Sequence, residues 1–125
     1  MNKKIQIETL LKEIGKPYEQ LNKDGTYQGC FYPMQVLYPE VRKYKLRYKT
    51  KEKIAEFALE KIKKYFFEIQ PSELQTGDLI AAKLKTGLHI AVYFEYGKVI
   101  HIFKENTLQI GRLKMFKNFQ AFRRK

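Results

Sequence analysis

The chain is poor in the side chains that form disulfides or ligate metals, with one cysteine, two histidines and no tryptophan among 125 residues. A single cysteine excludes a disulfide within the chain, so the fold does not depend on an oxidising compartment. The sequence also lacks an apolar run of the ~20 residues that a membrane helix needs, and its N-terminus lacks the apolar core of a secretion signal. We therefore expect a soluble chain that is made in the cytoplasm.

Acidic residues are scarce as well, because 13 Asp and Glu face 25 Lys and Arg, for a net charge of +12. The segment 42–51 alternates cations with Tyr44, Leu46 and Tyr48, a pattern that can bind single-stranded nucleic acid. An edge strand or extended loop with solvated lysines gives the same pattern, and we favour it because no RNA-binding signature accompanies the charge. Length and a 44% apolar composition predict one globular domain, residues 1–125.

Periodicity divides the chain into a helical half and a strand half. Apolar spacing and stop signals predict helices near 7–14, 30–38 and 50–66, the last with Phe66 at the end of its buried stripe. Short β-branched and aromatic runs separated by turn residues predict five strands, at 78–84, 88–94, 98–103, 107–113 and 119–123. Helices followed by an antiparallel meander predict an α+β fold.

The two histidines lie on the two strands of one predicted hairpin, twelve residues apart. A two-residue turn would place them on opposite faces. A three-residue loop at 95–97, with Gly97 in the left-handed conformation, would set His101 opposite Ala91 and on the same face as His89. That diagonal spans ~7–8 Å, within reach of two imidazole rings. We favour the second register, which brings the histidines together.

Cys30 stands far ahead of both histidines, at the expected start of a helix. Exposed N–H groups there and a nearby imidazolium would stabilise its thiolate, which suits a nucleophile with a histidine base. A buried structural cysteine is the alternative. Two histidines and one cysteine could also bind zinc, but a fourth ligand is not evident, so we predict no metal and no cofactor.

Four segments carry a family resemblance. They are Gly-Lys-Pro-Tyr at 15–18, Leu-Gln-Thr-Gly-Asp-Leu-Ile at 74–80, His-Ile-Ala-Val-Tyr at 89–93 and Gly-Lys-Val-Ile-His at 97–101. Together they resemble the NlpC-type cell-wall peptidases, papain-like cysteine endopeptidases of bacteria and phages. The resemblance implies a papain-like α+β fold, with N-terminal helices packed on an antiparallel meander or open barrel. It also implies hydrolysis of amide bonds in peptidoglycan stem peptides.

Carried over by position, the resemblance makes Cys30 the nucleophile, His89 the general base, His101 the orienting residue and Tyr18 an oxyanion-side donor. The chain departs from the family beside the nucleophile, where Gly29, Phe31 and Tyr32 replace the usual neighbours. An aromatic residue after the cysteine and the ending at 120–124 are similar to phage tail-tip members. We therefore expect a phage or prophage tail component that acts at the cell wall, with tail proteins as partners. The alternatives are a structural tail or binding protein without catalysis, and a small basic nucleic-acid-binding domain.

Overall fold

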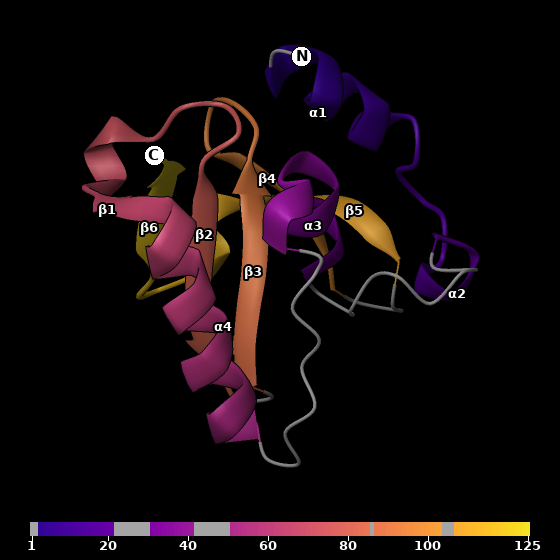
Figure 1. Cartoon of the computed structure of the whole chain (residues 1–125). Coiled ribbons are helices and arrows are strands. Elements are labelled where there is room, and N and C mark those ends of the chain that lie inside the picture. The colour runs from indigo at the N-terminus through magenta and orange to yellow at the C-terminus, as the bar shows by residue number, and fades with distance from the viewer. Residues whose placement is uncertain (1–2, 22–30, 42–50, 86, 104–106) are drawn as a thin grey trace.

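Helices from the first half of the chain cover one face of a sheet formed by the second half (Figure 1). The computed structural model describes residues 3–21, 31–41, 51–85, 87–103 and 107–125. The helical elements are α1 (Lys3–Leu11), α2 (Tyr18–Leu21), α3 (Tyr32–Leu37), η2 (Pro39–Val41) and α4 (Lys51–Tyr65). The strands are β1 (Phe66–Ile69), β2 (Leu79–Leu84), β3 (Gly87–Tyr93), β4 (Lys98–Ile102), β5 (Leu108–Arg112) and β6 (Gln120–Arg124), with short turns of 3₁₀ helix at η3 (Pro71–Glu73) and η5 (Leu113–Met115).

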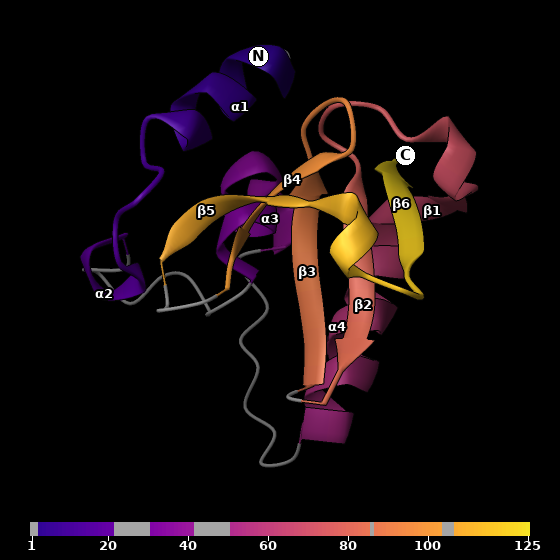
Figure 2. The same ribbon diagram turned by 180° about the vertical axis from the view of Figure 1, so that it is seen from behind.

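All strand pairs are antiparallel, and the order in the sheet is β1-β6-β2-β3-β4-β5. The five predicted strands correspond to β2 through β6. Strands β2 to β5 form the expected meander, with β1 and β5 at the open edges. The strand β6 does not continue the meander: it returns across the sheet and inserts between β1 and β2, as the view from behind shows (Figure 2).

One predicted helix ends earlier than its apolar stripe indicated. Phe66 was expected on the buried face of the third long helix, but α4 ends at Tyr65 and Phe66 begins β1. The backbone of Phe66 pairs with Arg124 of β6, while its side chain is almost fully buried. Pairing with a strand from the other end of the sequence overrides the local helical pattern here. A buried aromatic residue fits either interpretation until that partner is known.

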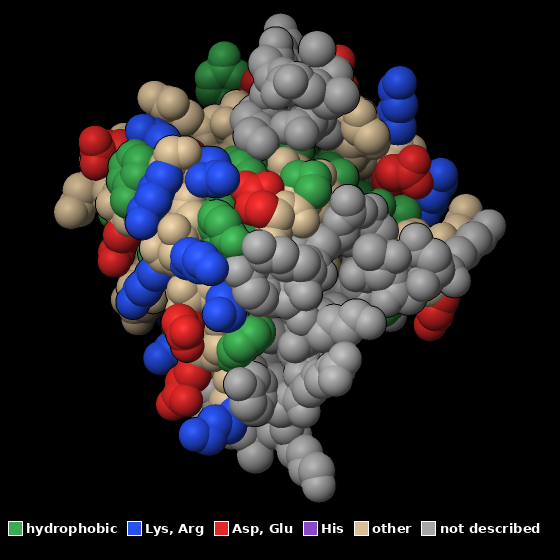
Figure 3. All heavy atoms as spheres, viewed as in Figure 1, with side chains coloured by type: hydrophobic (Ala, Val, Ile, Leu, Met, Phe, Trp, Pro, Cys, Tyr) green, Lys and Arg blue, Asp and Glu red, His purple; other side chains and the backbone are tan. Residues whose placement is uncertain are grey.

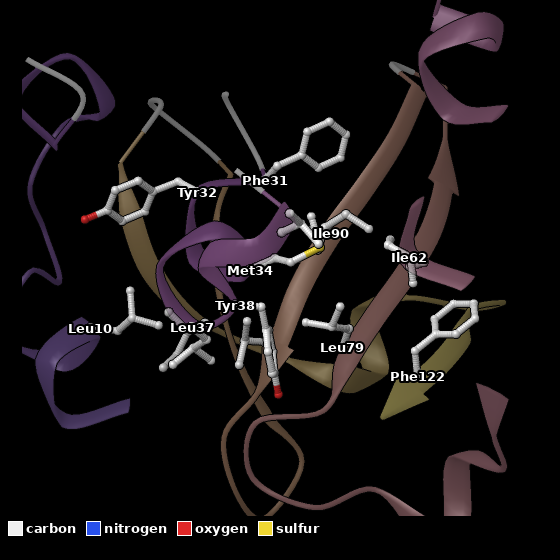
Figure 4. Close-up of a cluster of buried hydrophobic side chains, with 14 of the residues drawn as sticks. Leu10, Phe31, Tyr32, Met34, Leu37, Tyr38, Ile62, Leu79, Ile90 and Phe122 are labelled. Atoms are coloured by element: carbon white, nitrogen blue, oxygen red, sulfur yellow. The ribbon is translucent and has the colours of Figure 1, made fainter. Parts of the chain in front are cut away.

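The larger core lies between the sheet and the helices. It joins the buried faces of α1, α3 and α4 to alternate residues of β3, namely Leu88, Ile90 and Val92 (Figure 4). Pro33 in the first turn of α3 and Pro39 after it bound this short helix as predicted. Tyr38 fixes the helix to the sheet, because its hydroxyl donates a hydrogen bond of 2.5 Å to the carbonyl of Gly77.

A smaller apolar cluster lies on the opposite face of the sheet, around Ile80, Ala82, Ala91, Val99 and Phe116. Since side chains alternate along a strand, the residues of β3 between those of the larger core point to this second face. His89 is one of them. On the surface that carries α4, basic and acidic side chains are interspersed (Figure 3). No helix in the described part of the chain is long and apolar enough to span a membrane.

Candidate active site

The β3–β4 hairpin has the three-residue loop that the sequence predicted. Val92 pairs with Ile100 and Tyr93 with Val99, and the N–H of Phe94 donates a 2.9 Å hydrogen bond to the carbonyl of Lys98. Gly97 adopts the left-handed conformation with φ of 74°. Tyr96 also has a positive φ, 49°, which the sequence did not indicate. The same register, extended along the strands away from the loop, sets His101 opposite Ala91 and on the same face as His89.

The structure brings the two histidines into direct contact. Nε2 of His89 lies 2.8 Å from Nδ1 of His101, a hydrogen bond whose donor depends on the tautomer. Their rings are 5.1 Å apart between centroids and meet edge to face. His101 is 1% exposed and His89 is 6% exposed. Because His101 engages Nε2, the remaining nitrogen of His89, Nδ1, is left to face another partner.

Both imidazoles are held in the neutral form at neutral pH. Burial lowers the pKa of His89 from its usual 6.5 to about 4. Burial also lowers the pKa of His101 to about 4, and repulsion from a charge on His89 adds to the effect. A neutral pair joined by one hydrogen bond can relay a preference for one tautomer from ring to ring. If His89 donates from Nε2, its Nδ1 is unprotonated and can act as a base.

Two phenylalanines enclose the histidine pair. The predicted register puts Phe103 on the histidine face, but neither phenylalanine was predicted as a site residue. Phe103, just after β4, stacks on His101 with 5.3 Å between the ring centroids and 17° between the ring planes. Its ring centroid also lies 5.4 Å from that of His89. Phe116, just after η5, lies 5.6 Å from His89 and 6.0 Å from His101. These rings exclude water from the two imidazoles. The resulting desolvation lowers the pKa values of both histidines. No local signal in the sequence places Phe116 beside them.

Gly111 of β5 is a second feature of the site that the sequence did not identify. A Cβ atom at this position would lie 2.5 Å from Nε2 of His101 and 3.2 Å from its Cε1. No L side chain fits there without moving the imidazole, so the glycine makes room for the ring. A lone glycine inside a strand pattern signals a close approach of this kind. The expected meander places β4 beside β5, but the approaching group could not be named without the register between these two strands.

The other two predicted site residues are not placed beside the histidines by the described structure. Tyr18 begins α2, is half-buried and packs against the larger core. Cys30 lies outside the described residues. Phe31 and Tyr32, the departures that follow it, are buried in that larger core, 6% exposed each. Their aromatic side chains therefore fix α3 against the sheet.

Asp78, from the segment that carries part of the family resemblance, is a buried anchor of the sheet. Its carboxylate accepts hydrogen bonds from Nε and Nη2 of Arg123, at 3.1 and 2.9 Å, and from the N–H of Gln75 at 2.8 Å. The same Nη2 donates to the carbonyl of Glu73 at 2.6 Å. This bidentate pair raises the pKa of Arg123 above its usual value and fastens β6 to the start of β2.

No group of three potential metal ligands was found among the side chains in the described ranges. Residues 42–50 also lie outside them, so the basic segment singled out as a possible nucleic-acid site stays a prediction.

Comparison with known proteins identifies the fold and the family. No curated protein sequence is significantly similar to the chain. Among solved structures, the chain is similar to the NlpC/p60 domain of the peptidoglycan hydrolase SagA, with a TM-score of 0.62 and 21% identity over 97% of this chain and 98% of that one. At that identity the likeness shows a shared fold, the papain-like α+β arrangement expected from the sequence. The model of the NlpC/P60 family matches residues 15–123, nearly the whole described site and sheet. The chain belongs to the NlpC/P60 family.

Proposed function

We propose that the protein is a cysteine endopeptidase that hydrolyses amide bonds in the stem peptides of peptidoglycan. The observation that carries this proposal is the buried hydrogen bond between His89 and His101, which leaves Nδ1 of His89 as a base. Family membership supports the class of activity. The similar SagA domain is that of a peptidoglycan hydrolase, which supports the substrate.

In the proposed reaction, Nδ1 of His89 takes the proton of the Cys30 thiol, and the sulfur attacks the carbonyl carbon of the amide. The backbone N–H of Cys30 and the hydroxyl of Tyr18 stabilise the oxyanion of the tetrahedral intermediate. His89 then protonates the leaving amine, and the C–N bond breaks to give a thioester. Water, deprotonated by His89, releases the acid and regenerates the thiol. His101 holds His89 in the productive tautomer throughout.

We further propose that the chain is made in the cytoplasm and reaches the wall as part of a phage or prophage tail. This proposal rests on the resemblance of the segments around Cys30 and at 120–124 to tail-tip members. The net charge of +12 would favour an anionic cell wall as the target.

Hydrolysis of purified peptidoglycan by the full chain tests the proposed activity, with release of new amino groups as the measurement. Cys30→Ala should abolish release, and His89→Gln should reduce it by ~10²-fold or more. Lys63→Gln, on the exposed side of α4, serves as a matched control and should keep full activity. Unchanged release by Cys30→Ala would show that another group does the chemistry. No release by the unaltered chain would favour a structural tail or binding protein with this fold.

A further inference from the structure

The outer edge of β5 is open towards the C-terminal end of the strand. In the described sheet β5 is the last strand and pairs only with β4 (Figure 2). Just after β5, the N–H of Leu113 donates a 2.8 Å hydrogen bond to the carbonyl of Gly97, so the backbone of Leu113 faces β4. Backbone groups alternate in direction along an antiparallel strand. The residues whose backbone groups face away from β4 are therefore Leu108, Ile110 and Arg112.

The chain itself pairs with this edge at one end. The N–H of Leu108 donates to the carbonyl of Lys16 at 3.1 Å, and its carbonyl accepts from the N–H of Gly15 at 2.7 Å. Further along, the N–H and C=O groups of Ile110 and Arg112 have no backbone partner among the residues that the structure describes. Arg112 keeps an extended backbone, with φ of −110° and ψ of 134°. These donors and acceptors are available to another strand.

The side chains at this edge favour one kind of strand. Those of Ile110 and Arg112 share one face of the sheet, the face opposite the histidine pair. Ile110 is 44% exposed. Arg112 is exposed and lies directly across from Lys98, and neither cation forms an ion pair within the described ranges. An added strand with an apolar and an acidic residue on this face would cover the isoleucine and offset the repulsion.

We propose that this edge binds an extended segment of a partner protein as an additional antiparallel strand. The segment carries an acidic residue opposite Arg112 and, two positions later in its own sequence, an apolar residue opposite Ile110. The antiparallel direction follows the bridge that Pro17 already forms with Thr107 at the same edge. A second copy of the chain fits poorly, because pairing would bring the cations of two chains of net charge +12 together.

NMR titration of the isotope-labelled full chain tests the proposal, because it detects weak binding residue by residue. The probes are the blocked peptide Thr-Glu-Thr-Val-Thr-Thr and the same peptide with lysine in place of glutamate. In the free chain the amides of Ile110 and Arg112 should exchange with solvent faster than that of Gly111, which faces β4. The acidic peptide should shift both amide signals and slow their exchange, and it should bind about fivefold more tightly than the lysine peptide.

Two variants separate the contributions of charge and backbone. Arg112→Glu should reverse the preference, so that the lysine peptide binds about fivefold more tightly than the acidic one. Ile110→Pro removes an N–H that faces away from β4, a position where an edge strand tolerates proline. It should weaken binding of the acidic peptide about fivefold or more. Lys63→Glu, on the exposed side of α4, is the matched control for charge and should keep the original preference.

Unshifted amides at Ile110 and Arg112, or the same preference in Arg112→Glu as in Lys63→Glu, would overturn the proposal. So would shifts of these amides that depend on the concentration of the chain alone, which would make a second copy the occupant. Shifts caused by peptidoglycan fragments but by neither peptide would make the edge a substrate site instead. Since the readout is binding on the face opposite the histidines, each outcome is independent of the hydrolysis assay.

Discussion

His101 packs its imidazole directly against the backbone of Gly111, so closely that a methyl group on that glycine would lie 2.5 Å from Nε2. The ring is fixed from this side by β5, from another by Phe103, and at Nδ1 by His89. Three contacts from different parts of the chain thus set the orientation of one side chain. In the proposed reaction that orientation decides which nitrogen of His89 is free to act.

Gly111→Ala should displace the imidazole of His101. Overpacking of this kind costs ~1–3 kcal/mol, so the free energy of unfolding in urea should fall by about that amount. In a His101→Ala background the same glycine change should cost less than ~0.5 kcal/mol, because the clash has been removed. For peptidoglycan hydrolysis we expect a lower kcat with little change in KM. An equal loss of stability in both backgrounds would mean that the backbone of β5, and not His101, requires glycine.

Stability should depend on pH through the histidine pair. Both histidines have pKa values of about 4 in the fold, below the ordinary 6.5 that they regain on unfolding. Between those values the unfolded chain binds more protons, so stability is complete above about pH 6.5 and falls as the pH is lowered towards 4. The slope contributed by each histidine reaches at most ~1.4 kcal/mol per pH unit. Urea unfolding at pH 7, 6, 5 and 4.5 measures it.

The matched variant for that experiment is His89→Gln/His101→Asn, which retains polar atoms near the positions of Nε2 and Nδ1 but does not titrate. Its stability should change less between pH 7 and pH 5 than that of the unaltered chain. The same slope in both proteins would contradict the assignment of this pH dependence to the pair.

Cys30 is the only thiol in the chain, so alkylation reports on it without ambiguity. If His89 activates this thiol, its reaction with iodoacetamide at pH 6 should be at least ~10-fold faster in the unaltered chain than in His89→Ala. Mass spectrometry follows the single modification over time. If the unaltered chain and His89→Ala were alkylated at the same rate, and that rate matched a free thiol in a short peptide, His89 would not activate Cys30.

The ion pair between Asp78 and Arg123 should be important for stability. The side chain of Asp78 is 5% exposed, so Arg123→Ala leaves a buried carboxylate without its partner. The expected loss is about 2–4 kcal/mol in urea unfolding. Arg123→Lys should recover only part of it, because an ammonium cannot form the bidentate contact. Arg112→Gln is the control, because it also removes an arginine from a strand, and it should lower the free energy of unfolding little. A similar loss of stability in both variants would show that the ion pair with Asp78 is not the cause.

The hairpin geometry could be predicted because it is local. Gly97 stands where a three-residue loop needs its left-handed residue, and the loop length fixes which residues face each other. Gly111 and Phe116 could not be assigned to the site in the same way. They reach His101 from β5 and from the end of η5. The expected meander put β5 beside β4, but nothing local to Gly111 fixes the register between the two strands, and nothing local to Phe116 says that its ring returns to the histidines. Phe66 was wrongly predicted as helical for the same reason, since its strand partner is distant in the sequence.

The position of β6 has a consequence for how the molecule folds. Residues 120–124 lie between β1 and β2, and in the described sheet β1 pairs with no other strand. The hairpin that holds the histidines can form from neighbouring residues, but the attachment of β1 must wait until Gln120–Arg124 has been synthesised. Pairings between such distant segments close slowly. During refolding, the amides of the β3–β4 hairpin should therefore become protected from hydrogen exchange first. The amides of β1 and β6 should become protected later.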